Sequence, residues 1–173
     1  MGSETSGSIL SPSSANSLVG MKPTVGNVSR AGIVPISSTL DTAGPMTKFV
    51  IDNILIYNAI NDFDPIDEYS VENYDIKLES VIDNKTIKYR IGYYKSFYER
   101  DLLYKNSIDF LKEKGLDLID IDAPEIKLEG FAKILDEDMR HDLRSYLFSY
   151  GNKKLEVEDI SSIIKYNALD SVE

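Results

Sequence analysis

Proline and glycine interrupt the first 46 residues so often that this stretch cannot form a long helix. Proline fixes φ and lacks a backbone donor, and glycine allows backbone conformations that other residues avoid. The interrupting residues are Pro12, Pro23, Pro35, Pro45, Gly7, Gly20, Gly26, Gly32 and Gly44. Apolar residues such as Ile9, Val19 and Val28 recur between them, and a disordered linker would not need these. The stretch therefore predicts short buried strands and tight turns, with a helix possible at residues 12–18.

Length and charge restrict the class of protein. The 173 residues, 42% of them hydrophobic, suit one domain with an ordinary core. The formal net charge is −10, and it lies entirely in residues 61–173, because residues 1–60 contain three basic and three acidic side chains. Such acidity argues against nucleic acid or an anionic membrane surface as the main partner. No apolar run is long enough to cross a membrane and no signal peptide is visible, so we expect a cytoplasmic location.

The scarcity of cysteine and histidine excludes several chemistries. There is no cysteine, which excludes disulfides, thiol nucleophiles and thiolate metal sites. The single histidine, His141, lies among charged residues and is predicted to occupy a solvated helix face. No spacing of histidine and carboxylates matches a zinc or calcium site. We therefore expect no metal.

The remaining residues alternate between helical and extended patterns. Thr47 is a candidate N-cap for a helix over 48–60, and residues 61–86 are expected to form a surface connection. A strand over 87–94, a helix over 101–114 that ends at Gly115, and a strand over 116–121 form a β-α-β pattern. Two more helices are predicted, over about 131–150 and 157–169. The pattern indicates an α/β protein that contains a parallel strand pair.

Three short motifs follow one another in the first 46 residues. Gly-Ser-Glu-Thr-Ser-Gly-Ser-Ile at residues 2–9 precedes Gly-Met-Lys-Pro-Thr at 20–24 with Val-Ser-Arg at 28–30, and Asp-Thr-Ala-Gly-Pro-Met follows at 41–46. By itself the first motif resembles a flexible linker or a phosphate-binding loop, although no Gly-Lys-Ser/Thr follows it. Together the motifs closely resemble the core of the amidase signature family of serine hydrolases. Residues 1–60 would be its signature segment with the nucleophile loop, and residues 87–173 a β-α-β unit with covering helices of the same domain.

The resemblance implies a mechanism and a fold. Ser8 aligns with the acyl-accepting nucleophile, and the backbone amides of Thr5, Ser6, Gly7 and Ser8 align with the oxyanion hole. Family members hydrolyse linear amides through an acyl-enzyme with a Ser-Ser-Lys triad, without metal or cofactor. The implied fold is a partial α/β/α sandwich around a mixed β-sheet. Glu4 stands where the peptide-amidase-like branch has glutamate.

The same resemblance leaves part of the triad without a match. In the family the lysine and the bridging serine precede the nucleophile segment, and residues 1–173 contain neither motif. We therefore expect an internal fragment of a longer amidase that is inactive alone. Lys22 is an alternative base, because Ser-Lys pairs exist. Arg30 and Asp41 match positions expected to brace turns rather than to react.

Three functions are compatible with the sequence. The first is an amidase acting on small-molecule or peptide amides, completed by the missing parts of the same enzyme. The second is a non-catalytic amidase-like remnant or interaction module, whose open strands and apolar edges would favour a partner or self-association. The third is a protein similar to the amidase-like subunit of glutamyl-tRNA amidotransferases, which releases ammonia from glutamine.

Overall fold

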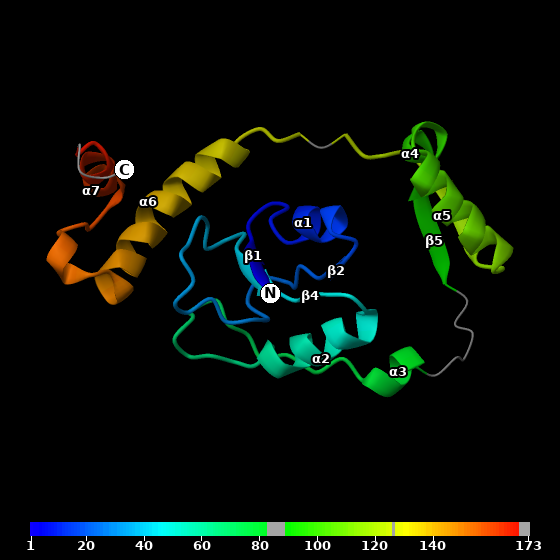
Figure 1. Ribbon diagram of the computed structural model, residues 1–173, viewed down its shortest axis with the longest axis horizontal. Coiled ribbons are helices and arrows are strands. Elements are labelled where there is room, and N and C mark those ends of the chain that lie inside the picture. The colour runs from blue at the N-terminus through cyan, green and yellow to red at the C-terminus, as the bar shows by residue number, and fades with distance from the viewer. Residues whose placement is uncertain (83–88, 126, 170–173) are drawn as a thin grey trace. The chain divides into compact units, whose positions relative to one another are not determined.

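The computed structural model describes residues 1–82, 89–125 and 127–169. It is a mixed α/β structure, which confirms the predicted fold class (Figure 1). The strands are β1 Gly2–Glu4, β2 Val19–Gly20, β3 Thr42–Gly44, β4 Met46–Thr47, β5 Arg90–Tyr94 and β6 Asp117–Ile121. The helices are α1 Leu10–Ala15, α2 Val50–Ile60, α3 Leu78–Ile82, α4 Lys95–Arg100, α5 Leu102–Glu113, α6 Phe131–Tyr150 and α7 Ile160–Asn167, with a 3₁₀ turn η1 at Lys153–Leu155.

The chain forms two units, residues 1–80 with 129–173 and residues 81–128. In the first unit, β1 pairs antiparallel with β3 and β2 pairs antiparallel with β4. These are the short strands predicted from the proline and glycine pattern. The close approach of β3 to its neighbours requires glycine, because a Cβ on Gly44 would collide with the carbonyl oxygen of Met21.

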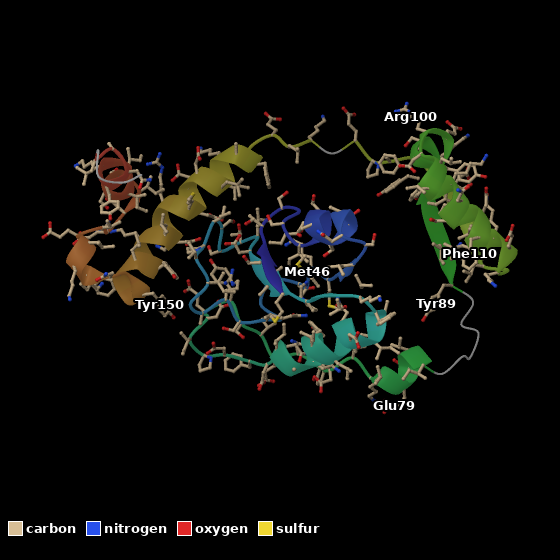
Figure 2. The ribbon with its side chains drawn as sticks, viewed as in Figure 1. Met46, Glu79, Tyr89, Arg100, Phe110 and Tyr150 are labelled. Carbon is tan, nitrogen blue, oxygen red and sulfur yellow. The ribbon has the colours of Figure 1, made fainter. Side chains whose placement is uncertain are left out.

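A small apolar cluster lies under these strands. Val28, Ala43 and Tyr57 are buried together, and Met21, Ile33, Ile60 and Ile76 pack against them. Ile9 is fully buried beside Gly2 and Gly44. Met46 of β4 also lies among these strands (Figure 2). The core of this unit is therefore built from the signature segment and α2.

Helix α2 starts later than predicted. Its N-cap is Phe49, and Thr47 is not a cap, because its Oγ1 donates to the Phe49 carbonyl oxygen at 2.8 Å. Thr47 belongs to β4, where pairing with Val19 holds it in an extended conformation. Ile54 and Tyr57 on α2 are buried, whereas Val50 at its start is exposed.

The second unit is a β-α-α-β arrangement. β5 and β6 pair in parallel with Arg90 opposite Asp117, as the sequence pattern predicted. The predicted helix over 101–114 is α5, and Asp101 caps it by accepting from the Tyr104 amide at 2.9 Å. Gly115 follows with φ +79°, which suits a residue that ends a helix. Tyr89, Arg100 and Phe110 are exposed on this unit (Figure 2). Residues 83–88 of the predicted connection and first strand lie outside the described residues.

Helix α6 has the predicted bounds and belongs to the first unit. The last helix, α7, is shorter than the predicted 157–169, and its N-cap Asp159 forms a capping box with Ser162. No helix among the described residues is both long and apolar enough to cross a membrane. The division of the chain at residues 60 and 86 stays a prediction.

Candidate nucleophile loop and its braces

The candidate nucleophile loop, residues 5–8, connects β1 to α1. Gly7 has φ +93°, a conformation that strains any residue with a Cβ. Ser8 follows it, exposed, just before the helix. The loop is therefore a tight turn that presents a serine hydroxyl at the surface of the described chain.

Glu4 holds the two ends of this loop together. Its side chain is buried, and Oε2 accepts from the amides of Ile9 at 2.6 Å and Leu10 at 2.9 Å. Burial raises the pKa of Glu4, but hydrogen bonds from the backbone amides of Leu10, Gly7 and Ile9 outweigh it, so the pKa lies below its ordinary value. An ionised carboxylate thus fixes the start of α1 relative to β1.

Asp41 joins the nucleophile loop to a second loop, residues 36–41, which we call the bracing loop. Thr5 Oγ1 donates to Asp41 Oδ1 at 2.5 Å. Asp41 Oδ2 accepts from the amides of Ile36 at 2.7 Å and Ser37 at 2.9 Å. The carboxylate is buried, so both loops are held by the same charged acceptor.

The backbone amides of the nucleophile loop differ in their partners. Within the described residues, the amides of Thr5, Ser6 and Ser8 donate no hydrogen bond, whereas the Gly7 amide interacts with the Glu4 carboxylate. Unpaired N–H groups in a tight turn can bind a negatively charged oxygen. Three of the four amides assigned by resemblance thus have no hydrogen-bond partner among the described residues.

Lys22 and Arg30 both contact backbone carbonyls or carboxylates. Lys22 Nζ donates to the Leu40 carbonyl oxygen at 3.0 Å, within the bracing loop. Arg30 forms a two-pronged pair with Asp67, at 2.8 Å from Nη2 and 3.0 Å from Nε, and its Nη1 donates to the Ser38 carbonyl. The hydrogen bond with Asp67 raises the pKa of Arg30. Both basic side chains therefore brace turns.

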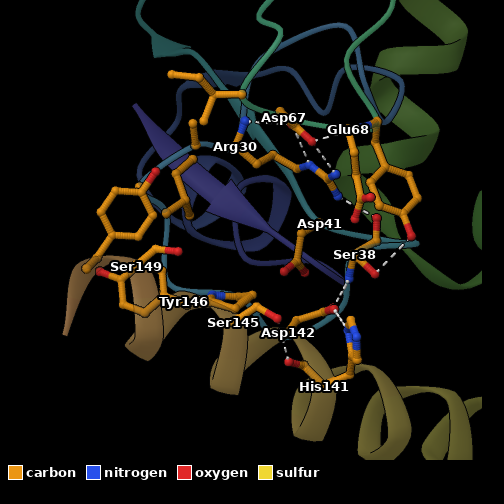
Figure 3. A pocket seen from close by; sticks show the side chains of 17 residues that line it. Arg30, Ser38, Asp41, Asp67, Glu68, His141, Asp142, Ser145, Tyr146 and Ser149 are labelled. Atoms are coloured by element: carbon orange, nitrogen blue, oxygen red, sulfur yellow. Dashed lines mark hydrogen bonds and ion pairs between the residues drawn. The ribbon is translucent and has the colours of Figure 1, made fainter. Parts of the chain in front are cut away.

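A cavity of about 360 Å³ lies beside the bracing loop. Figure 3 shows Arg30, Asp41 and Asp67 on one side of it and residues of α6, among them Asp142 and Tyr146, on the other. His141 borders the cavity, yet its side chain is 81% exposed, in agreement with the predicted solvated face. No group of three or more metal-ligating side chains occurs among the described residues.

Comparison with known proteins identifies the family. The profile of the family described as Amidase matches residues 1–172. The chain belongs to the amidase family. A glutamyl-tRNA(Gln) amidotransferase subunit from Neisseria meningitidis is 37% identical over 134 residues, which are 74% of this chain and 28% of that protein.

Solved amidase structures are similar as well. An amidase family protein from Bacillus anthracis is 30% identical with a TM-score of 0.79, over 98% of this chain and 35% of that one. The native peptide amidase from Stenotrophomonas maltophilia is 26% identical with a TM-score of 0.77, over 96% of this chain and 36% of that one. The chain thus spans about a third of the length of these relatives. The amidase resemblance and the fold that it implied are confirmed.

Three carboxylates of this amidase region were not identified from the sequence. Asp67 pairs with Arg30, Asp138 Oδ2 accepts from the hydroxyls of Ser37 at 2.5 Å and Thr39 at 2.7 Å, and Asp142 Oδ2 accepts from the Ser38 amide at 2.7 Å. The i, i+4 spacing of Asp138 and Asp142, which places them on one face of a helix, was the only available signal. Their partners lie about a hundred residues away, and no local pattern indicates such pairs.

Proposed function

We propose that this chain carries the nucleophile of an enzyme that hydrolyses linear amides. Ser8 Oγ would attack the amide carbonyl, and the backbone amides of Thr5, Ser6, Gly7 and Ser8 would stabilise the oxyanion. The observation that supports this best is an exposed serine at the end of a glycine turn, held by a buried glutamate, in a chain of the amidase family.

The proposed reaction has two steps. Ser8 Oγ loses its proton to a base and bonds to the carbonyl carbon, after which the C–N bond breaks and the proton passes to the departing nitrogen. Water then attacks the acyl-serine ester and releases the acid. The turn at Gly7 would aim its N–H groups at the oxygen that becomes negative, and each such donor contributes ~10²- to 10³-fold to the rate. Small-molecule and peptide amides are the proposed substrates.

The base is the missing part of this proposal. Lys22 Nζ donates to the Leu40 carbonyl, a contact suited to bracing a turn. The lysine and bridging serine implied by the resemblance have no match in residues 1–173. Removing the base or nucleophile of a serine protease costs on the order of 10⁶ in kcat, so we expect the 173-residue chain alone to react slowly.

A fluorophosphonate probe tests the assignment of Ser8 directly. The full chain is incubated with the probe, and the labelled residue is located by peptide mass spectrometry. Oxyanion stabilisation without the base leaves roughly 10³- to 10⁴-fold rate enhancement in other serine hydrolases, so slow but selective labelling of Ser8 is expected. Ser8→Ala should abolish the labelling, and Ser11→Ala, which removes a neighbouring exposed serine, should not.

Two other outcomes have distinct meanings. Labelling spread over several exposed serines, or labelling that persists in Ser8→Ala, would show that Ser8 is not the nucleophile. Rapid stoichiometric labelling of Ser8 would support its assignment as the nucleophile. It would contradict the expectation that residues 1–173 lack the base.

The sequence identity to an amidotransferase subunit supports a second candidate function. In this alternative the same serine would release ammonia from glutamine, as one component of a larger assembly. Incubating the chain with glutamine or with a C-terminal peptide amide, followed by intact-mass analysis, separates the two. A glutamyl adduct on Ser8 favours the amidotransferase, and a peptidyl adduct favours the amidase.

A further inference from the structure

Helix α6 reaches the nucleophile loop through an unbroken series of hydrogen bonds. The series begins with Asp138 and Asp142, four residues apart on the helix. Asp138 accepts from the hydroxyls of Ser37 and Thr39, and Asp142 accepts from the Ser38 amide. The bracing loop is thus attached to α6 at three consecutive residues.

Asp41 connects the bracing loop to the nucleophile loop. Asp41 accepts from the amides of Ile36 and Ser37 with one oxygen and from Thr5 Oγ1 with the other. Ser37 is completely buried and takes part in both sets of contacts, since its hydroxyl binds Asp138 and its amide binds Asp41. Thr5 lies three residues before Ser8.

We propose that Asp138 and Asp142 are positioning residues for the nucleophile loop, acting through the bracing loop, Asp41 and Thr5. The proposal deepens the proposed function, since it assumes that residues 5–8 form the reacting loop. Neither aspartate needs to touch substrate. Their role is to hold Asp41 where it fixes the Thr5 side chain, and so to fix the direction of the amides that follow.

Charge and burial make the series suited to this role. Asp142 has a side chain only 12% exposed, and the hydrogen bonds from Ser37 and Thr39 lower the pKa of Asp138, with burial opposing weakly. Hydrogen bonds to an ionised acceptor are shorter and stronger than neutral ones. Networks of this kind couple their members beyond the sum of separate contacts, which double-mutant cycles can measure.

The facing groups determine how the series responds to pH. Ser37, Ser38 and Thr39 of the bracing loop face the two aspartates, and His141, next to Asp142 on α6, is the titratable neighbour at 3.1 Å. The lowered pKa of Asp138 keeps this carboxylate ionised near neutral pH, so its contacts with Ser37 and Thr39 should persist there.

Amide hydrogen exchange of the full chain tests the proposal without requiring catalysis. Asp138→Ala should accelerate exchange at the amides of Ile36 and Ser37 and also at those of Ile9 and Leu10, which end the nucleophile loop. Roughly 10- to 100-fold is expected, the change typical of a lost hydrogen bond to a charged group. Asp138→Asn keeps an acceptor oxygen without the charge and should restore part of the protection. Asp136→Ala, an exposed aspartate on the same helix, is the matched control.

Thr5→Val separates positioning from general stability. This substitution removes the hydroxyl that joins the two loops, so Asp138→Ala in the Thr5→Val background should no longer affect Ile9 and Leu10. If the changes in exchange at Ile9 and Leu10 caused by Thr5→Val and by Asp138→Ala simply add in the double variant, the proposal is overturned. Unchanged exchange at Ile9 and Leu10 in Asp138→Ala would also overturn it. An Asp138→Asn variant that exchanges as fast as Asp138→Ala would overturn the hydrogen-bond route.

A milder variant covers the case in which Asp138→Ala unfolds the first unit. Unfolding would appear as fast exchange in the β1–β3 ladder, and Ser37→Ala then removes the same contact from the opposite side. It should accelerate exchange at Ile9 and Leu10 while the ladder stays protected, and no acceleration would overturn the proposal. Failure of Ser8 to react with a fluorophosphonate would instead contradict the proposed function and leave the exchange result intact.

Discussion

At the scale of single residues, the candidate site depends on carboxylates that accept backbone hydrogen bonds. Glu4 is the clearest example, since it is 3% exposed and accepts from two amides at the start of α1. Its lowered pKa keeps it ionised near neutral pH. The geometry of residues 5–8 therefore depends in part on this buried carboxylate.

Replacing that charge with a neutral amide should loosen the loop without removing its shape. Glu4→Gln keeps one acceptor oxygen but weakens both bonds, so the free energy of unfolding should fall by about 1–3 kcal/mol, the range for hydrogen bonds to charged groups. Urea unfolding followed by circular dichroism measures the change. The exposed Glu72→Gln is the matched control and should stay within about 0.5 kcal/mol of the unsubstituted chain. Equal effects of the two substitutions would contradict the role of Glu4.

The sequence identified the residues of the nucleophile loop more readily than the carboxylates that hold it and its neighbouring loop in place. Ser8, Thr5, Ser6 and Gly7 were assigned by resemblance, and the positive φ of Gly7 fits a turn there. The assignment of Ser8 as nucleophile remains a prediction. Asp67, Asp138 and Asp142 could not be found, because their importance comes from partners distant in the sequence.

At the scale of elements, helix α2 is fastened to two short strands by one side chain. Asn53 is fully buried, and its Nδ2 donates to the carbonyl oxygens of Val19 and Pro45 and to Thr47 Oγ1, at 2.9, 3.3 and 3.1 Å. Strands of two residues have few hydrogen bonds of their own. The helix therefore supplies contacts that the β2–β4 pair lacks.

Asn53→Ala should destabilise the first unit by about 2–3 kcal/mol, because buried acceptors lose their donor. The measurement is again the midpoint and slope of urea unfolding. Asn106→Ala on α5 makes the same chemical change at an exposed position and should have little effect. A similar loss in both variants would show that the Asn53 contacts do not hold α2 to the strands.

Elements with strong local signals were predicted well from the sequence. α6 has the predicted bounds because its apolar spacing is regular, and Gly115 ends α5 because only glycine favours its positive φ. α4 was missed, since its six residues are too short for a helical period to show. Thr47 was wrongly assigned as a cap because strand pairing, which is not local, decides its conformation.

At the scale of the whole molecule, acid should weaken the first unit. Burial raises the pKa of Asp67, but its hydrogen bonds with Arg30 and backbone amides lower it overall, and Glu4 and Asp138 are lowered as well. Groups with a lowered folded pKa stabilise the protein fully above the unfolded value, near pH 4, and this stabilisation is lost as pH falls through the folded values.

The expected result is a stability that is flat from about pH 8 to 5 and falls steeply below about pH 4. Hydrogen exchange at a series of pH values, corrected for intrinsic rates, should show the loss at residues 4–10, 30–41 and 67–69. Asp67→Asn should flatten part of this dependence. Stability that rises on acidification would contradict the sign of all three shifts.

Three buried or half-buried carboxylates, Glu4, Asp41 and Asp142, are held mainly by hydrogen bonds from the backbone rather than from side chains. Glu4, Asp41 and Asp142 accept from the amides of Ile9, Leu10, Ile36, Ser37 and Ser38. Every residue except proline has such an amide. These hydrogen bonds therefore depend on the backbone conformation and not on which side chains the donor residues carry. Positions such as Leu10, Ile36 and Ser38 should therefore tolerate sequence drift between amidases, provided that proline does not enter and each carboxylate remains.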